Sequence, residues 1–178
     1  MKFYTPHISV EDAIKCSLDH ANEKNLLSRW NETTAEHERL KPARLGLIHT
    51  DWRRDGAENP TYYDHELPAV GIFASGKEAD DESKAGISLL PVEAVLSIVA
   101  QSGDPTWAAR EAKAITGCLA QHFRDLRSGD TDDDVNGITR IARLIAVGED
   151  VTRPAYQTNR SWTGEAALKL TITIATEG

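Results

Sequence analysis

Residues 168–174 alternate strictly between apolar and polar side chains, and no other part of the sequence constrains the fold as strongly. Leucine or isoleucine occupies every second position, and the positions between them hold Lys169, Thr171 and Thr173. Successive side chains of a β-strand point to opposite faces of the sheet. The pattern therefore predicts a strand with one apolar face packed on a core, and a fold that contains a β-sheet.

A second regular pattern begins at Asp104-Pro105 and predicts a long helix. Asp104 can accept hydrogen bonds from the free amides of the first turn, and Pro105 lacks an amide hydrogen that the first helical position does not use. Arg127-Ser128-Gly129 ends the pattern. Apolar side chains recur in between at helical spacing: Ala108, Ala112, Ile115, Leu119, Phe123 and Leu126. We expect this helix to cover one face of the sheet.

Weaker patterns predict the remaining elements. Ser9 and Asp12 resemble a capping box, in front of a helix over residues 10–27. Apolar runs bounded by turn residues predict three further strands, at residues 69–74, 92–100 and 138–147.

The order of these elements predicts a single α+β domain over residues 1–178. Its largely antiparallel, mixed sheet is covered by the long helix, with a second helix at the N-terminus. Residues 28–66 are mostly polar and contain scattered aromatic side chains. We interpret them as an elaboration packed on the core, with one short strand at 45–49.

Net charge and targeting signals limit the classes of function. The chain has 28 acidic and 20 basic side chains, a formal net charge of -8, which is the wrong sign for a protein that grips nucleic-acid phosphates. We find no secretory signal at the N-terminus and no apolar run of the roughly 20 residues that a membrane span needs. Cys16 and Cys118 are too few to form a disulfide framework. We therefore expect a cytosolic protein with reduced cysteines and negligible binding to duplex DNA.

The sequence contains none of the common motifs for phosphate binding or hydrolysis. This favours a structural or assembly role over an enzymatic one, with no catalytic residue and no cofactor. The alternative is a small enzyme whose site assembles from residues distant in sequence, around His49, Asp51 and His65.

Two arrangements in the sequence combine residue types that bind metals. Cys16 with His20 and Cys118 with His122 each lie four residues apart on predicted helices, and would form a zinc site if those helices packed side by side. Buried cysteines with surface histidines are commoner, so no metal is expected.

The other arrangement, at residues 132–137, fits the first half of a calcium-binding loop. The position that should supply a bidentate glutamate holds Arg143. We interpret the segment as a solvated acidic turn.

The sequence suggests an interface instead. Residues 77–84 are too charged to be buried and are interpreted as a hairpin tip. Residues 148–164 are interpreted as a long connection between the last two strands, with the arginine and aromatic content typical of interfaces. The predicted interface residues are Arg143, Arg153, Tyr156, Arg160 and Trp162 on the basic side and Glu78, Asp80, Asp81 and Glu82 on the acidic side.

Residues 68–176 resemble, in element order and texture, the tail-terminator proteins of long-tailed bacteriophages, the lambda type. No diagnostic motif carries the resemblance. It rests on Pro68-Ala69-Val70-Gly71-Ile72-Phe73, the strand at residues 92–100, the helix start Asp104-Pro105-Thr106-Trp107 and the closing strand Ala167-Leu168-Lys169-Leu170-Thr171-Ile172.

The resemblance implies a homo-oligomer, a hexameric ring, that caps the tail tube and joins it to the head connector or neck protein. DNA would pass through the ring without specific binding, which agrees with the acidic net charge. The protein would be synthesised in the cytoplasm of the bacterial host and located in the virion, at the junction of tail and neck. The alternatives are a neck or head-completion protein and the small cytosolic enzyme described above.

Overall fold

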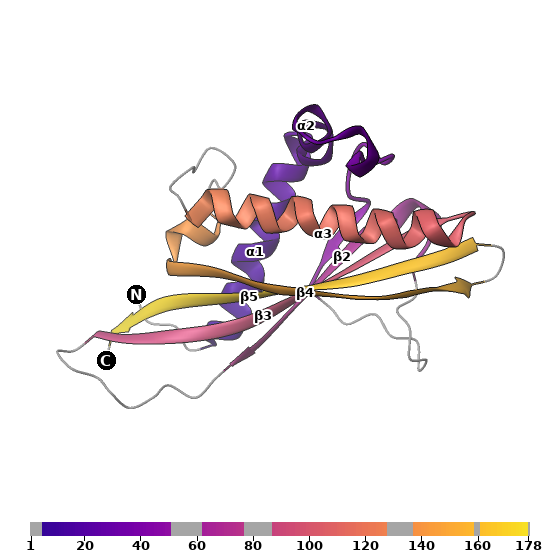
Figure 1. Ribbon diagram of the computed structural model, residues 1–178. Helices are drawn as coiled ribbons and strands as arrows, with labels where there is room; N and C mark the ends of the chain where they lie inside the picture. Colours follow the sequence, from indigo (N-terminus) through magenta and orange to yellow (C-terminus); the bar gives the residue numbers. More distant parts are fainter. Residues whose placement is uncertain (1–4, 51–61, 77–86, 128–136, 159–160, 178) are drawn as a thin grey trace.

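The structure is a computed structural model, and it describes residues 5–50, 62–76, 87–127, 137–158 and 161–177 (Figure 1). Within these residues, five strands form one sheet in the order β1-β2-β3-β5-β4. β1 is parallel to β2, and the other neighbours are antiparallel. The predicted α+β fold with a largely antiparallel sheet is confirmed. The strands are β1 Leu47–His49, β2 Ala69–Gly76, β3 Ile87–Ser102, β4 Ala142–Thr158 and β5 Ser161–Glu177.

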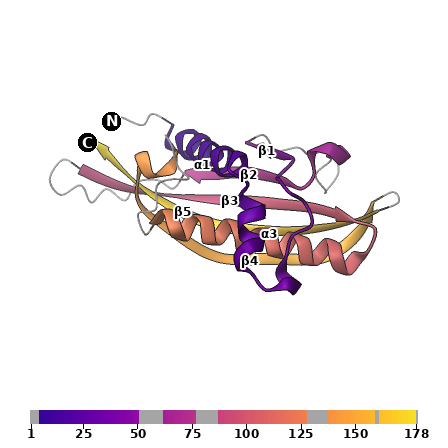
Figure 2. The same ribbon diagram turned by 90° about the horizontal axis from the view of Figure 1, so that it is seen from above.

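Helix α3, Pro105–Arg127, runs along the length of the sheet and confirms the predicted long helix (Figures 1 and 2). Its start follows from local chemistry, because the Trp107 amide donates a hydrogen bond to Asp104 Oδ1 at 3.0 Å. All six side chains of the predicted apolar stripe are buried. Burying a large aliphatic side chain contributes about 1.5–3 kcal/mol gross, so this stripe fixes the helix on the sheet.

The N-terminal helix differs from its predicted bounds. Helix α1 spans Pro6–Glu23, and a second helix, α2, spans Leu26–Thr33. Asn25 separates them with a φ of 59°, a left-handed conformation that asparagine tolerates and that ends a helix. Because α1 begins at Pro6, Ser9 lies inside the helix, and its hydroxyl donates a hydrogen bond to the Thr5 carbonyl instead of capping the helix.

α1 and α3 lie on the same side of the sheet. Ser17 on α1 and His122 on α3 are joined by a hydrogen bond of 3.1 Å between Oγ and Nε2, and both side chains are buried. At the β2 edge of the sheet, Glu11 Oε1 accepts a hydrogen bond from the Ala74 amide at 2.8 Å. α1 thus covers the part of the core that α3 does not reach.

The segment expected to be an elaboration supplies an edge strand. β1 lies within the predicted short strand, and three-residue 3₁₀ helices, Glu36–Glu38 and Asp64–Glu66, lie on either side of it in the chain. The strand predicted at residues 138–147 begins later than expected. Ile138–Arg140 forms a third 3₁₀ helix, and β4 starts at Ala142.

The largest correction concerns the predicted connection at residues 148–164, of which residues 148–158 and 161–164 belong to strands. β4 and β5 continue as a paired hairpin to Thr158 and Ser161, which lie opposite each other. Long antiparallel pairing satisfies the backbone donors and acceptors that a loop of this length would expose. The sequence of β4 does not show the alternation of apolar and polar residues that is typical of a strand. Register shifts between Val147 and Asp150 and between Arg153 and Tyr156 interrupt that alternation.

Candidate interaction surface

The two faces of the sheet differ in what covers them. Gly164 on β5 packs so closely on α3 that an added Cβ would lie 2.0 Å from the Ala108 carbonyl oxygen. Even-numbered residues of β5 therefore point toward α3, and Leu168, Leu170 and Ile172 among them are buried. Odd-numbered residues of β5 point the other way. We call this second side the open face.

The register of pairing assigns the other strands to the same two faces, because residues directly opposite each other point to the same side. Val95 on β3 lies opposite both Phe73 on β2 and Lys169 on β5. On β4, Leu144 lies opposite Thr173 and Val151 lies opposite Ala167.

Among the described residues, four large apolar side chains are exposed on the open face. Phe73, Leu89, Leu144 and Val151 come from three different strands, and between 49% and 60% of each remains accessible. Half-buried residues of β3 and β5 lie between them, namely Pro91, Val95, Thr171 and Thr173. We call these four exposed residues the apolar patch. Large apolar side chains exposed on one face of a sheet favour that face as a site that binds another macromolecule.

One end of the open face carries polar side chains that are covered. His49 on β1 is buried, and its Nε2 is 2.7 Å from the hydroxyl of Tyr62. The imidazole ring lies over Gly71, where an added Cβ would be 3.1 Å from its Cε1. The absence of a side chain at Gly71 therefore creates the space that the histidine occupies.

At the same end of the open face, on a strand separated from β1 by β2 and β3, Glu165 of β5 is buried and bonded to two residues of β4. Tyr156 donates a hydrogen bond to Glu165 Oε1 at 2.5 Å, and Arg153 Nη1 lies 2.9 Å from Oε2. Burial raises the pKa of the Tyr156 phenol well above its ordinary value, and the bond to Glu165 and the charge of that carboxylate act in the same direction. The carboxylate is thus bonded within the sheet, which favours a structural role over a catalytic one.

The predicted interface residues are only partly brought together. Arg153 and Tyr156 lie on the open face, whereas Trp162 lies opposite Ser102 and Gln157 and points to the helix side, where it is half-buried. Arg143 is exposed on β4. The remaining predicted residues lie outside the described residues: Arg160, Glu78, Asp80, Asp81 and Glu82.

The apolar patch was missed because its members are scattered along the sequence. Phe73 and Leu89 belong to apolar runs, and a run of this kind is equally consistent with a strand buried on both faces. Only the register showed that they share a face with Leu144 and Val151.

The structure does not assemble the zinc ligand set. Although α1 and α3 are in contact, Ser17 faces His122, and Cys16 and His20 line a separate hollow with Asp12 and Glu23. Among the described residues, no group of three or more histidine, cysteine or acidic side chains could hold a metal ion. The acidic turn at residues 132–136, considered for calcium, lies outside the described residues.

The residues of the enzyme alternative are not seen to converge. His49 is bonded to Tyr62, and the exposed His65 stacks on Tyr63 with ring centroids 5.8 Å apart. Asp51 lies outside the described residues.

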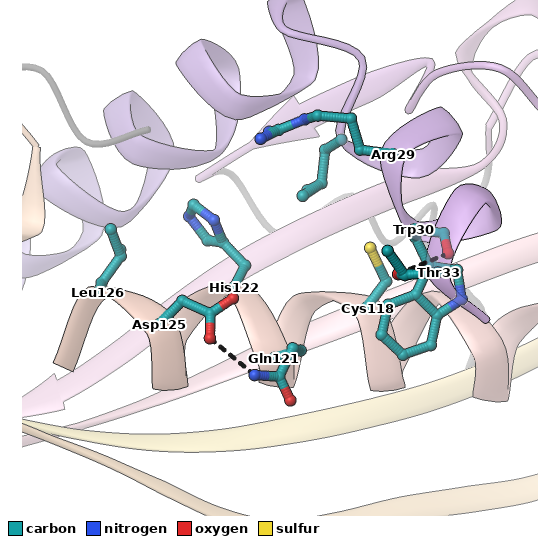
Figure 3. Close-up of a pocket in the computed structure, with 9 residues that line it drawn as sticks. Arg29, Trp30, Thr33, Cys118, Gln121, His122, Asp125 and Leu126 are labelled. Atoms are coloured by element: carbon teal, nitrogen blue, oxygen red, sulfur yellow. Dashed lines mark hydrogen bonds between the residues drawn. The ribbon is translucent and has the colours of Figure 1, made fainter. Parts of the chain in front are cut away.

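A cleft of about 230 Å³ lies between α2 and α3 (Figure 3). Figure 3 shows Cys118 and His122 on α3, with Arg29 and Trp30 on α2. Burial raises the pKa of the Cys118 thiol to about 12, so the thiol is neutral at physiological pH. The hydroxyl bonded to His122 belongs to Ser17, which is fully buried and inaccessible to a substrate. A protonated thiol and a buried hydroxyl favour a helix-packing seam over a catalytic site.

Comparisons with known proteins do not place the chain in a family. No family model matches it, and no curated protein matches it significantly. Within the described residues, no helix combines the length and apolar character needed to span a membrane.

Proposed function

We propose that this chain is a structural protein of the virion of a long-tailed bacteriophage. It is a subunit of a hexameric ring that caps the tail tube and joins it to the head connector or neck protein. Its partners are further copies of itself, the tube protein and the connector, and DNA passes through the ring without specific binding.

The observation that supports this proposal best is the apolar patch on the open face. Several large apolar side chains exposed on one face favour an interface there, because removing apolar surface from water is favourable. The exposed Glu93 and Lys169 lie on the same face as the patch. Such a mixture of apolar and charged groups is typical of subunit interfaces.

The net charge supports the proposal that DNA passes through the ring without specific binding. A ring through which DNA moves must not retain it, and a protein of formal net charge -8 offers few cations to replace the counterions of the phosphates. We expect no gel shift of duplex DNA at physiological salt. Micromolar binding that weakens steeply with added salt would contradict this part of the proposal.

The proposal is tested by placing a charge on the apolar patch. Phe73→Asp and Leu144→Asp change exposed residues, so the circular dichroism and melting temperature should remain close to those of the wild type. Light scattering and negative-stain microscopy of the purified chain, and of phage tails assembled in its presence, should show loss of rings and loss of incorporation.

The matched control is Ile8→Asp, the same kind of change at a residue of α1 that is 46% exposed and does not belong to the sheet. It should assemble normally. Leu170→Asp should unfold the subunit, because it buries an unpaired carboxylate. A wild-type chain that stays monomeric and is absent from tails would refute the proposal. Normal tails that fail to join heads would assign the neck or head-completion role instead.

A further inference from the structure

An exposed tryptophan lies between two cations at the start of α3. Trp107 is 39% exposed, and its ring centroid lies 4.1 Å from Lys41 Nζ and 5.6 Å from Arg110 Cζ. Lys113, one turn of helix beyond Arg110, is also exposed. We call Lys41, Trp107, Arg110 and Lys113 the Trp107 patch. Tryptophan and arginine are among the residues most enriched where binding energy is concentrated in interfaces.

The Trp107 patch has an excess of positive charge. Within the described part of the chain, its three cations form no ion pair. The two neighbouring carboxylates accept hydrogen bonds from backbone amides, Asp104 from Trp107 and Glu111 from Lys41. An acidic surface on a partner would therefore be attracted to this end of α3.

The outer side of α1 carries an acidic hollow of about 370 Å³, which is large enough to receive an indole ring. It lies opposite the buried side chains of the same helix. Asp19 in the hollow is paired with Lys15 at 2.5 Å. Asp12 and Glu23 are exposed, and neither forms an ion pair with another described residue. The residues of this α1 hollow are Asp12, Lys15, Cys16, Asp19, His20 and Glu23.

The two surfaces lie apart within one subunit. α1 contacts α3 near the end of α3, where Ser17 is bonded to His122 at 3.1 Å. Fifteen helical positions separate His122 from Trp107, which is about 22 Å of helix. Figures 1 and 2 show α1 beside the last half of α3, whereas the start of α3 lies at one end of the molecule. The Trp107 patch can therefore meet an α1 hollow only on another molecule.

We propose that the Trp107 patch of one copy docks in the α1 hollow of a second copy of this chain. The indole ring enters the hollow, and the cations beside it meet Asp12 and Glu23 at the rim. An aromatic side chain flanked by cations thus matches an acidic hollow in both shape and charge.

Because the two surfaces are different, the contact is head-to-tail. Contacts of this kind generate a ring where the rotation closes and a filament where it does not. The inference names a contact between subunits of the proposed ring and, in that respect, rests on the proposed function.

Zero-length cross-linking with a carbodiimide tests the contact directly. The full-length chain is mixed at high concentration with an isotopically labelled copy, and cross-linked peptides are identified by mass spectrometry. We expect mixed-label peptides that join Lys41 or Lys113 to Asp12 or Glu23. Cross-links found only within one copy would overturn the proposal. In assembled tails, links from these lysines to the tube or connector protein, without links to a second copy, would overturn it as well and assign the patch to that partner.

A mixing experiment tests the head-to-tail geometry. Arg110→Glu impairs the Trp107 patch, and the double variant Asp12→Lys, Glu23→Lys impairs the α1 hollow. Each variant alone should self-associate at least about tenfold more weakly than the wild type, by sedimentation velocity. Mixed together, they retain one complementary pair of surfaces and should form dimers and nothing larger. A mixture that stays monomeric would overturn the proposal.

Circular dichroism and melting temperature establish that each variant folds, and Trp107→Ala replaces Arg110→Glu should the latter not fold. The matched control is Arg124→Glu, which reverses another exposed charge on α3 and should self-associate like the wild type. Equal weakening by the control would overturn the proposal.

The same variants separate this inference from the proposed function. Head-to-tail oligomers that never enter tails would refute the tail role and leave the contact intact. Normal tails assembled from Arg110→Glu would refute the contact and leave the tail role intact.

Discussion

The hydroxyl of Tyr156 on β4 is bonded at 2.5 Å to Glu165 of the neighbouring strand β5, and this bond ties the distal half of the long hairpin together. Arg153 bonds the second oxygen of the same carboxylate at 2.9 Å. Tyr156 and Arg153, the two residues bonded to Glu165, lie within residues 148–164, which the sequence predicts to be a loop. The polar residues there therefore contribute to the stability of the fold, in addition to any role at a surface.

The first prediction follows from this bond. Tyr156→Phe keeps the ring but removes a donor from a buried carboxylate, which should lower the free energy of unfolding by about 1–3 kcal/mol in urea denaturation at neutral pH. Tyr63→Phe, at a tyrosine that is 72% exposed, is the control and should change it by less than about 0.5 kcal/mol. Equal effects of the two substitutions would show that the bond to Glu165 contributes nothing.

We also expect Tyr156 to make the free energy of unfolding depend on pH in the alkaline range. The folded state raises the pKa of Tyr156 above the ordinary value of about 10. Above that pH the unfolded chain binds fewer protons than the folded one, so the contribution of this group to stability falls as the pH rises. Between roughly pH 9 and 11, the wild type should therefore lose more stability than Tyr156→Phe does.

Another prediction concerns the contact between β5 and α3. Gly164→Ala would place a Cβ 2.0 Å from the carbonyl oxygen of Ala108 and 2.4 Å from its carbon, and backbone atoms cannot rotate away as a flexible side chain can. We expect destabilisation of about 1–3 kcal/mol or more in thermal and urea unfolding. Gly103→Ala, where no atom lies within 4 Å of the added Cβ, should be close to neutral. Equal stability of both variants would contradict the close packing of this helix on the sheet.

A further prediction concerns the cleft between α2 and α3. With its pKa raised to about 12, the buried Cys118 thiol is almost entirely protonated at pH 8 and should resist alkylation. Cys16 is only partly buried and should react first with iodoacetamide. Peptide mapping by mass spectrometry over a time course measures both rates, and in denaturing urea they should become similar. A fast-reacting Cys118 in the folded chain would show that the cleft contains a reactive nucleophile after all.

Elements with a strong local signal could be predicted from the sequence. The Asp104 cap and the apolar stripe of α3 depend on residues within a few turns of each other, and β5 is specified by its own alternation. The candidate surface was predicted only in part. Arg153 and Tyr156 lie on the open face, and their part in an interface stays a prediction, whereas the prediction of a long connecting loop around them was wrong.

The sequence by itself determined which segments have an apolar face, because that property is a matter of spacing along one chain. The tertiary structure alone decided which neighbour each face meets. β4 lost its local pattern to register shifts and is recognisable only through its pairing with β5, and Asn25 divides a continuous apolar pattern into two helices. Phe73, Leu89, Leu144 and Val151 share one face of the sheet only because strand register, a property of residues far apart in the chain, places them opposite the side that α3 covers.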